Sequence, residues 1–490
     1  MSQIIDREGK PLTRGATTEH TLLNAGFNLL GTSLAAQEYW DNHRALDYLL
    51  TRKDIDPEHI GVYGSSGGGT QTAYYIGLDP RVKVAAICSF FSTRERTMEL
   101  QGPSDGCQHI PYEGREQLEV PDFALMMAPR PLLILSGKYD FVDLWGAQQG
   151  FAELQQCYKV LGVPEKVDML TVETGHGLGA EKRQKLVSWF KRWLKDNQSP
   201  VKKAAQDRFQ LSDMLCTTKG QVNVSMPGAL SIMQENVNQL DEWASKRETF
   251  LSKGKKTVQT KMLDLLGLKG LPDHKIRIEA TGHDSMREYE QYKFQLIREG
   301  EMPVPCILIM PSRANADSPI ELRLQEEGKG TYLSEYANFA AALTEGKILL
   351  LADLRGLGET TDPAFYTDAK YWNREYRNAM ISMHIGRPIM GQRVVDILTL
   401  LDFCSEHELL KGHPVKVFAN GIYGPAVIHA AYLDERINSV EITHSVKTWK
   451  EYIEKPMQWD MYSNVLYGAL KYYDLPDLIR LSNRSIRFAD

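Results

Sequence analysis

The stretch Ile60-Gly61-Val62-Tyr63-Gly64-Ser65-Ser66-Gly67-Gly68-Gly69 joins a short apolar segment to a glycine-rich turn, and a helix-like segment, Thr70–Leu78, follows it. The pattern G-x-S-x-G between a strand and a helix is typical of a nucleophile elbow, a tight turn that exposes a serine. A phosphate-binding loop of the Walker type would need a lysine that is missing here. We therefore predict Ser66 as a nucleophile and the N–H group of Gly67 as half of an oxyanion hole.

The first 200 residues alternate between short apolar segments and helix-like segments. Near-continuous apolar strands that alternate with helices indicate an α/β fold with a parallel sheet covered on both faces. The expected strands are Ile60–Tyr63, Val84–Phe91, Pro131–Ser136 and Lys166–Val172. The expected helices include Trp40–Thr51, Trp145–Leu161 and Glu181–Asp196.

A serine nucleophile needs a base and an acid, and in folds of this kind they follow it in the order acid, then histidine. Asp140 and Asp143 both follow the third expected strand, and we prefer Asp140 as the acid because Asp143 also fits the N-cap of the next helix. His176, between two glycines after the fourth strand, is the candidate base. The predicted chemistry is acyl transfer by double displacement on Ser66, which needs no metal or organic cofactor.

Five further residues are weaker candidates for binding a substrate: Ser65, His20, Gln108, His109 and Trp145. The chain has 6 cysteines, and they lie singly. None of them forms a C-x-x-C pair or a Cys/His spacing typical of a metal site. We therefore expect free thiols and no metal.

The chain also contains an internal repeat with a constant offset of 355 positions. Leu78-Asp79-Pro80-Arg81-Val82 matches Leu433-Asp434-Glu435-Arg436-Ile437, and the offset holds over about 90 residues. Such a repeat predicts two copies of one α/β fold. In the second copy Gly421 stands where Ser66 stands in the first, so we expect that copy to lack a nucleophile.

Composition excludes several classes of protein. Of the 490 residues 42% are hydrophobic and 24% are charged, which is ordinary for a globular protein. The net charge is −6 and no basic cluster is present, which disfavours nucleic acid as a partner. No apolar run approaches the length of a membrane-spanning helix.

The sequence resembles the bacterial acetyl xylan esterase-like branch of the α/β-hydrolases, and a pectin methylesterase branch looks similar at the same motifs. Besides the elbow, the resemblance rests on Thr17-Thr18-Glu19-His20, Trp40-Asp41, Leu46-Asp47-Tyr48-Leu49, Ala128-Pro129-Arg130-Pro131, Asp140-Phe141, His176-Gly177, Cys216–Val222 and Asp353–Thr360. It implies two-domain esterases of plant cell-wall polysaccharide that are typically exported. The resemblance implies that the first copy lacks its opening strands, so we expect a chain truncated at its N-terminus.

These observations predict a fold class of two α/β-hydrolase-like domains with mostly parallel sheets covered by helices. The expected domains are a catalytic domain over 1–200, a linker with a helical and β-strand arm over 201–285, and a degenerate copy over 286–490. Asn197–Gln206 is the expected linker proper.

The leading functional hypothesis is a serine ester hydrolase that removes O-acetyl groups from a plant polysaccharide. Three alternatives remain: a pectin methylesterase, a prolyl-oligopeptidase-like peptidase, and a non-catalytic carbohydrate-binding pseudoenzyme. The expected partner is a polysaccharide or a small ester. The sequence leaves open the oligomeric state and the location, which is cytoplasmic for the chain as it stands and periplasmic or secreted by the family resemblance.

Overall fold

The computed structural model describes residues 3–201, 209–218, 220–363 and 370–489. Positions 202–206 of the expected linker therefore lie outside the described residues. The chain divides into two compact units. The first contains Met1–Asn24 and Ser33–Ser231, and the second contains Ala25–Thr32 and Ile232–Asp490.

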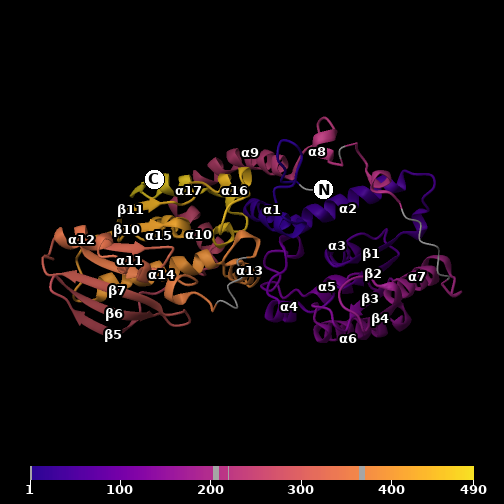
Figure 1. Ribbon diagram of the computed structural model, residues 1–490, viewed down its shortest axis with the longest axis horizontal. Coiled ribbons are helices and arrows are strands. Elements are labelled where there is room, and N and C mark those ends of the chain that lie inside the picture. Colours follow the sequence, from indigo (N-terminus) through magenta and orange to yellow (C-terminus); the bar gives the residue numbers. More distant parts are fainter. Residues whose placement is uncertain (1–2, 202–208, 219, 364–369, 490) are drawn as a thin grey trace. The chain divides into compact units, whose positions relative to one another are not determined.

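The first unit is built on a four-stranded parallel sheet in the order β1-β2-β3-β4 (Figure 1). The register pairs Ser65 with Cys88 and Cys88 with Leu135, so the strands end at one common edge. The strands are β1 (Gly61–Ser65), β2 (Val84–Cys88), β3 (Leu132–Gly137) and β4 (Val167–Val172). The helices are α1 (Ala16–Leu30), α2 (Leu34–Leu50), α3 (Gly67–Ile76), α4 (Arg94–Leu100), α5 (Val120–Leu125), α6 (Leu144–Val160), α7 (Ala180–Lys195) and α8 (Val222–Ser225).

Alternate residues of these strands face opposite sides of the sheet, as the two-residue period of a strand requires. Ala85 and Ile87 of β2 pack with residues of α2, α3, α5 and α6 on one face. Val84 and Ala86 pack with Leu186 and Trp189 of α7 on the other face. Because both faces are covered, the central strands are apolar throughout, as the sequence pattern predicts.

The second unit has a mixed eight-stranded sheet in the order β12-β11-β10-β8-β9-β7-β6-β5. Its first five strands are parallel, and β7, β6 and β5 run antiparallel to their neighbours. The strands are β5 (Arg277–Ser285), β6 (Tyr289–Ile297), β7 (Val304–Pro311), β8 (Ile320–Leu324), β9 (Ile348–Ala352), β10 (Val415–Asn420), β11 (Ile437–Thr443) and β12 (Ser485–Phe488). The helices are α9 (Ile232–Leu251), α10 (Lys255–Leu265), α11 (Lys329–Leu333), α12 (Ala337–Thr344), α13 (Tyr376–His384), α14 (Ile389–Glu406), α15 (Gly424–Leu433), α16 (Lys450–Glu454) and α17 (Leu475–Leu481).

The offset of 355 residues carries the elements of the first unit onto those of the second. Helix α2 begins at Leu34 and α14 begins at Ile389, while β1 ends at Ser65 and β10 ends at Asn420. Helices α5 and α17 both begin with a capping box. The two copies differ at one edge, because β10 pairs with both β8 and β11 whereas β1 is an edge strand next to β2.

A partly buried ion-pair network also recurs at the same offset. In the first unit Arg81 binds Asp79 through Nη2 at 2.5 Å and Asp47 through Nη1 at 2.5 Å. In the second unit Arg436 binds Asp434 at 2.6 Å and Asp402 at 2.7 Å. Because each arginine stands just before a strand of the sheet and binds an aspartate on α2 or α14, the network ties that helix to the amino-terminal edge of the sheet.

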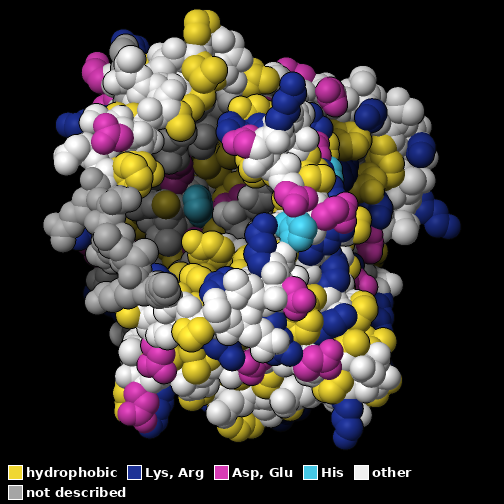
Figure 2. Space-filling view, turned by 90° about the vertical axis from the view of Figure 1, so that its right-hand side faces the viewer, with side chains coloured by type: hydrophobic (Ala, Val, Ile, Leu, Met, Phe, Trp, Pro, Cys, Tyr) yellow, Lys and Arg dark blue, Asp and Glu magenta, His cyan; other side chains and the backbone are white. Residues whose placement is uncertain are grey.

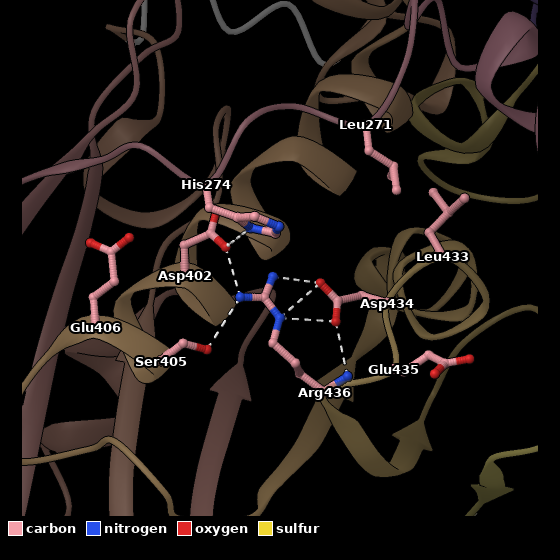
Figure 3. A pocket seen from close by; sticks show the side chains of 9 residues that line it. All are labelled: Leu271, His274, Asp402, Ser405, Glu406, Leu433, Asp434, Glu435 and Arg436. Atoms are coloured by element: carbon pink, nitrogen blue, oxygen red, sulfur yellow. Dashed lines mark hydrogen bonds and ion pairs between the residues drawn. The ribbon is translucent and has the colours of Figure 1, made fainter.

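Figure 3 shows the second of these networks, in which Arg436 lies between Asp402 and Asp434, with His274 bound to Asp402. Together with neighbouring residues they line a surface hollow of about 630 Å³. The hollow lies before β11, at the edge of the sheet opposite to the position of an elbow. Its charged groups are thus paired with one another as part of the repeated fold.

Lys and Arg side chains are interspersed with Asp and Glu side chains on the face of the molecule drawn in Figure 2. Among the described helices, none is long and apolar enough to cross a membrane.

The Arg81 network provides a test of the fold. Burial alone would raise the pKa of Asp79, but hydrogen bonds from Arg81 and Tyr75 outweigh it and hold that pKa well below 3.8. Arg81→Ala leaves this buried carboxylate without its main partner, so we expect a loss of about 3–5 kcal/mol in the free energy of unfolding. Urea-induced unfolding at pH 7 measures this loss.

Arg44→Ala is the matched control, because Arg44 is exposed and also forms an ion pair with Asp47; exposed pairs contribute about 0–1 kcal/mol. Since the folded-state pKa of Asp79 is depressed, its stabilisation is lost as the pH falls below 3.8. The difference between wild type and Arg81→Ala should shrink there. Equal effects of the two variants at pH 7 would refute this account.

Candidate active site

Ser66 lies at a sharp turn between β1 and α3, with φ 58° and ψ −124°. A non-glycine residue rarely adopts this conformation, and such strain is often found at functional sites. The turn needs glycines nearby, because a Cβ atom on Gly64 would clash with the carbonyl oxygen of Gly68. A Cβ atom on Gly69 would lie 2.8 Å from the carbonyl oxygen of Cys88. The backbone of β1 thus passes so close to the start of α3 that a side chain at the glycine positions would not fit.

The N–H group of Gly67 is the first of helix α3, so no carbonyl of that helix can accept from it. The positive end of the helix dipole adds to the attraction for an anion at this position. The turn therefore presents a serine hydroxyl next to a free backbone donor.

Asp140 and His176 meet in the loops that follow β3 and β4. His176 Nδ1 lies 2.8 Å from Asp140 Oδ1. The side chain of Asp140 is 1% exposed and that of His176 is 29% exposed, so the carboxylate is shielded while the ring can be reached. The ring of Phe141 stacks on His176 with centroids 4.2 Å apart and fixes the plane of the imidazole.

The carboxyl group of Asp140 is held in its charged form. Burial alone would raise its pKa, but the hydrogen bonds with His176 and the Val142 N–H group outweigh burial and keep the pKa below 3.8. The nearby hydroxyl of Ser89 lowers the pKa further. A charged carboxylate can orient the imidazole and stabilise its protonated form.

Ser89 and Lys182 are two residues of this region that the sequence motifs did not single out. Lys182 is 1% exposed, and its ammonium group donates to Ser89 Oγ at 3.2 Å and to the carbonyl oxygen of Gly177 at 3.0 Å. The N–H group of Gly177 donates to Ser89 Oγ at 3.1 Å. These hydrogen bonds fix the position of Gly177, the residue that follows His176. The sequence does not reveal this role, because Lys182 looks like an ordinary lysine in the amphipathic pattern of α7.

Ser66, Asp140 and His176 follow β1, β3 and β4, so all three lie at the carboxyl-terminal edge of the sheet, with β2 between β1 and β3. Within the described residues Ser66 Oγ makes no hydrogen bond to His176. In free enzymes of this kind the catalytic hydrogen bonds are often long and tighten when substrate binds.

Asp143, the second candidate acid, is the N-cap of α6 and accepts a bond from the Gly146 N–H group at 2.7 Å. It also lies 3.4 Å from Arg96. Trp145 is exposed, and the guanidinium of Arg96 lies 5.1 Å from the centre of its ring.

Of the other candidate binding residues, His20, Gln108 and His109 lie at or beside the turn Gly106–Gln108, and Ser65 lies at the end of β1. His109 is buried. Gln108 is fixed by its carbonyl group, which accepts bonds from Tyr74 and Arg94. His20 lies beside a cysteine and an aspartate, a cluster that the spacing of the cysteines did not predict.

The second unit has the same turn with different side chains. Gly421 has φ 64°, close to the value at Ser66. The N–H group of Ile422, which corresponds to that of Gly67, donates to Glu326 Oε2 at 3.1 Å. A Cβ atom on Gly421 would clash with Glu326. A carboxylate thus occupies the place where the first unit presents its serine and its free donor.

Comparison with known proteins gives the class of the first unit. Residues 30–197 match the model of the prolyl oligopeptidase family. The parallel sheet, the elbow and this match identify the first unit as an α/β-hydrolase fold. A Bacillus subtilis protein described as a hydrolase, YtaP, is 26% identical over 168 residues, which are 34% of this chain and 56% of that protein. The chain therefore spans a little over half the length of this curated relative.

Solved structures similar to the chain include a Bacteroides fragilis protein described as an acetyl xylan esterase. It is 14% identical, with a TM-score of 0.41, and the match covers 50% of this chain and 68% of that chain. A glucuronoyl esterase from Caldicellulosiruptor kristjansonii is 19% identical, with a TM-score of 0.31, and its match covers 37% of this chain and 55% of that chain.

The steric limit at the elbow can be tested with two glycines of the same turn. Gly64→Ala places a methyl group against the backbone of Gly68, so we expect a loss of about 1–3 kcal/mol in the free energy of unfolding. Gly68→Ala is the control, because a Cβ atom there meets nothing within 4 Å. Chemical denaturation of both variants gives the comparison. A Gly64→Ala variant as stable as Gly68→Ala would contradict the close crossing of β1 and α3.

Proposed function

We propose that the chain is a serine hydrolase that cleaves carboxylic esters, with Ser66 as nucleophile, His176 as general base and Asp140 as the orienting acid. The observation that carries this proposal is the strained serine at the carboxyl edge of a sheet whose next loops hold an Asp–His pair at 2.8 Å. In acyl transfer by such a triad, the histidine acts first as a base and then as an acid.

In the first step Ser66 Oγ attacks the ester carbonyl carbon while its proton passes to His176. The oxyanion accepts a hydrogen bond from the N–H group of Gly67, and His176 returns the proton to the departing alcohol. Water then attacks the acyl-serine, giving its proton to His176, and the acid leaves as Ser66 is re-protonated. Asp140 keeps its charge throughout and stabilises the imidazolium.

We propose an O-acetylated plant polysaccharide as the substrate, on the ground of the sequence resemblance to acetyl xylan esterases. The family match over 30–197 also supports a second candidate, hydrolysis of a peptide bond by the same triad. We further propose that the second unit is non-catalytic, since Glu326 fills its elbow.

Ser66→Ala tests the nucleophile. We expect hydrolysis of 4-nitrophenyl acetate to fall by about 10⁴-fold or more, because the covalent path is lost. Ser188→Ala is the matched control, since its hydroxyl only bonds the Lys185 carbonyl on α7. A fluorophosphonate should label wild type at Ser66, as read by mass spectrometry. Activity that survives Ser66→Ala would rule out this nucleophile.

Asp140→Asn and Asp143→Ala separate the two acids. The first should lower kcat by about 10⁴-fold, because an amide cannot hold the imidazole in the required tautomer. The second should leave kcat within a few-fold and lower the free energy of unfolding by about 1 kcal/mol, the usual effect of losing an N-cap. The reverse pattern would assign the acid to Asp143.

The products that the chain releases from each candidate substrate identify its substrate. Acetate released from acetylated xylan supports the proposal, whereas methanol released from pectin would make the chain a methylesterase. Cleavage of a proline-containing peptide, with no ester turnover, would establish the peptidase. If no substrate is turned over and the polysaccharide retards the chain on an affinity gel, the chain is a binding protein.

A further inference from the structure

Three side chains with metal-binding atoms meet in the first unit, away from the Asp140–His176 pair in sequence. His20 lies on α1, and Asp105 and Cys107 lie at the short 3₁₀ turn Gly106–Gln108. The ligand atoms all lie within 4.8 Å of one another. Since 85 residues separate His20 from Asp105, only the fold brings this set together.

The separations match the edges of a tetrahedron around one small cation. Nδ1 of His20 lies 3.2 Å from Cys107 Sγ and 3.6 Å from Asp105 Oδ2. Cys107 Sγ lies 3.5 Å from Asp105 Oδ2. Zinc bonds of about 2.0–2.3 Å to N, O and S ligands give tetrahedral edges of roughly 3.3–3.8 Å. The donors therefore stand within a few tenths of an ångström of these distances before any cation is added.

The backbone that carries these donors is packed tightly. The Gly106 N–H group donates to Thr21 Oγ1 at 3.0 Å, and a Cβ atom on Gly106 would lie 2.7 Å from the His20 carbonyl oxygen. On its other side the turn is bound by Tyr74, whose hydroxyl donates to the Gln108 carbonyl at 3.1 Å. A site on such a support loses little conformational freedom when it binds an ion.

The surroundings favour a positive charge. Glu38 on α2 is close enough for its charge to act on His20 and Cys107, and its Oε2 atom is buried with no hydrogen-bond partner among the described residues. The carboxylate of Asp105 is itself buried. A divalent cation would compensate these carboxylates. The side chain of His20 is 32% exposed, which leaves a path from solvent.

We propose that His20, Asp105 and Cys107 bind one divalent transition-metal ion of the zinc class. Binding forms a metal–sulfur bond and releases the thiol proton of Cys107 to solvent. A mixed N, S and O donor set suits zinc or cobalt and disfavours magnesium and calcium. The ion would tie α1 to the turn Gly106–Gln108. This site shares no residue with the proposed triad, so the metal-site proposal and the proposed function can be refuted independently.

Cobalt is the probe, because its thiolate bond gives a charge-transfer absorption. Tag-free protein is treated with a chelator, desalted and titrated with CoCl₂ under a reducing agent. We expect one equivalent to bind, with a thiolate-to-cobalt band that Zn²⁺ removes in competition. Zn²⁺ should also raise the melting temperature, since it binds the folded state.

Cys107→Ser and His20→Gln should each weaken Co²⁺ binding by about 100-fold or more, because each removes a direct ligand. The controls are Cys157→Ser and His59→Ala, which remove a cysteine and a histidine elsewhere in the first unit and should bind as wild type. Circular dichroism shows whether each variant is folded. The proposal is overturned if wild type shows no thiolate band or if a folded Cys107→Ser variant keeps it.

Discussion

The close crossing of β1 over the start of α3 is the constraint on which the proposed site depends. Gly64 and Gly69 allow it because any Cβ atom on either would meet backbone. At this crossing Ser66 takes a positive φ of 58°. The next residue, Gly67, begins α3 with an N–H group that no carbonyl of that helix can accept. A geometry that costs strain thus gives a nucleophile and an anion-binding donor together.

The second unit shows what the same crossing does with other side chains. Gly421 keeps the positive φ, and the N–H group of Ile422 still attracts a negative group. That group is Glu326, which enters from the loop after β8, the neighbour of β10. The anion-binding property therefore belongs to the backbone of the fold, whereas the nucleophile is a local addition. An elbow that lacks its serine can be filled by the protein itself.

The two copies keep their Arg–Asp networks at the amino-terminal edge of the sheet, although their elbows have diverged. A buried carboxylate that loses its arginine is left uncompensated, so such a network tolerates little change. The elbow residues Ser65, Ser66 and Gly67 of the first unit are partly exposed, whereas Gly421, Ile422 and Tyr423 of the second unit are buried. Stability and chemistry are thus placed at opposite ends of the same strands.

The sequence by itself determined the alternation of strands and helices, the repeat at 355 residues, and the elbow at Ser66, because each is a local pattern with its own period or steric need. The choice between Asp140 and Asp143 needed the fold, since both follow β3 and only packing shows that one meets His176 while the other caps α6. The support from Lys182 and the cluster of His20, Asp105 and Cys107 were also decided only by tertiary structure. In both cases the partners are far apart in the chain, and no spacing along a sequence records a contact that folding alone creates.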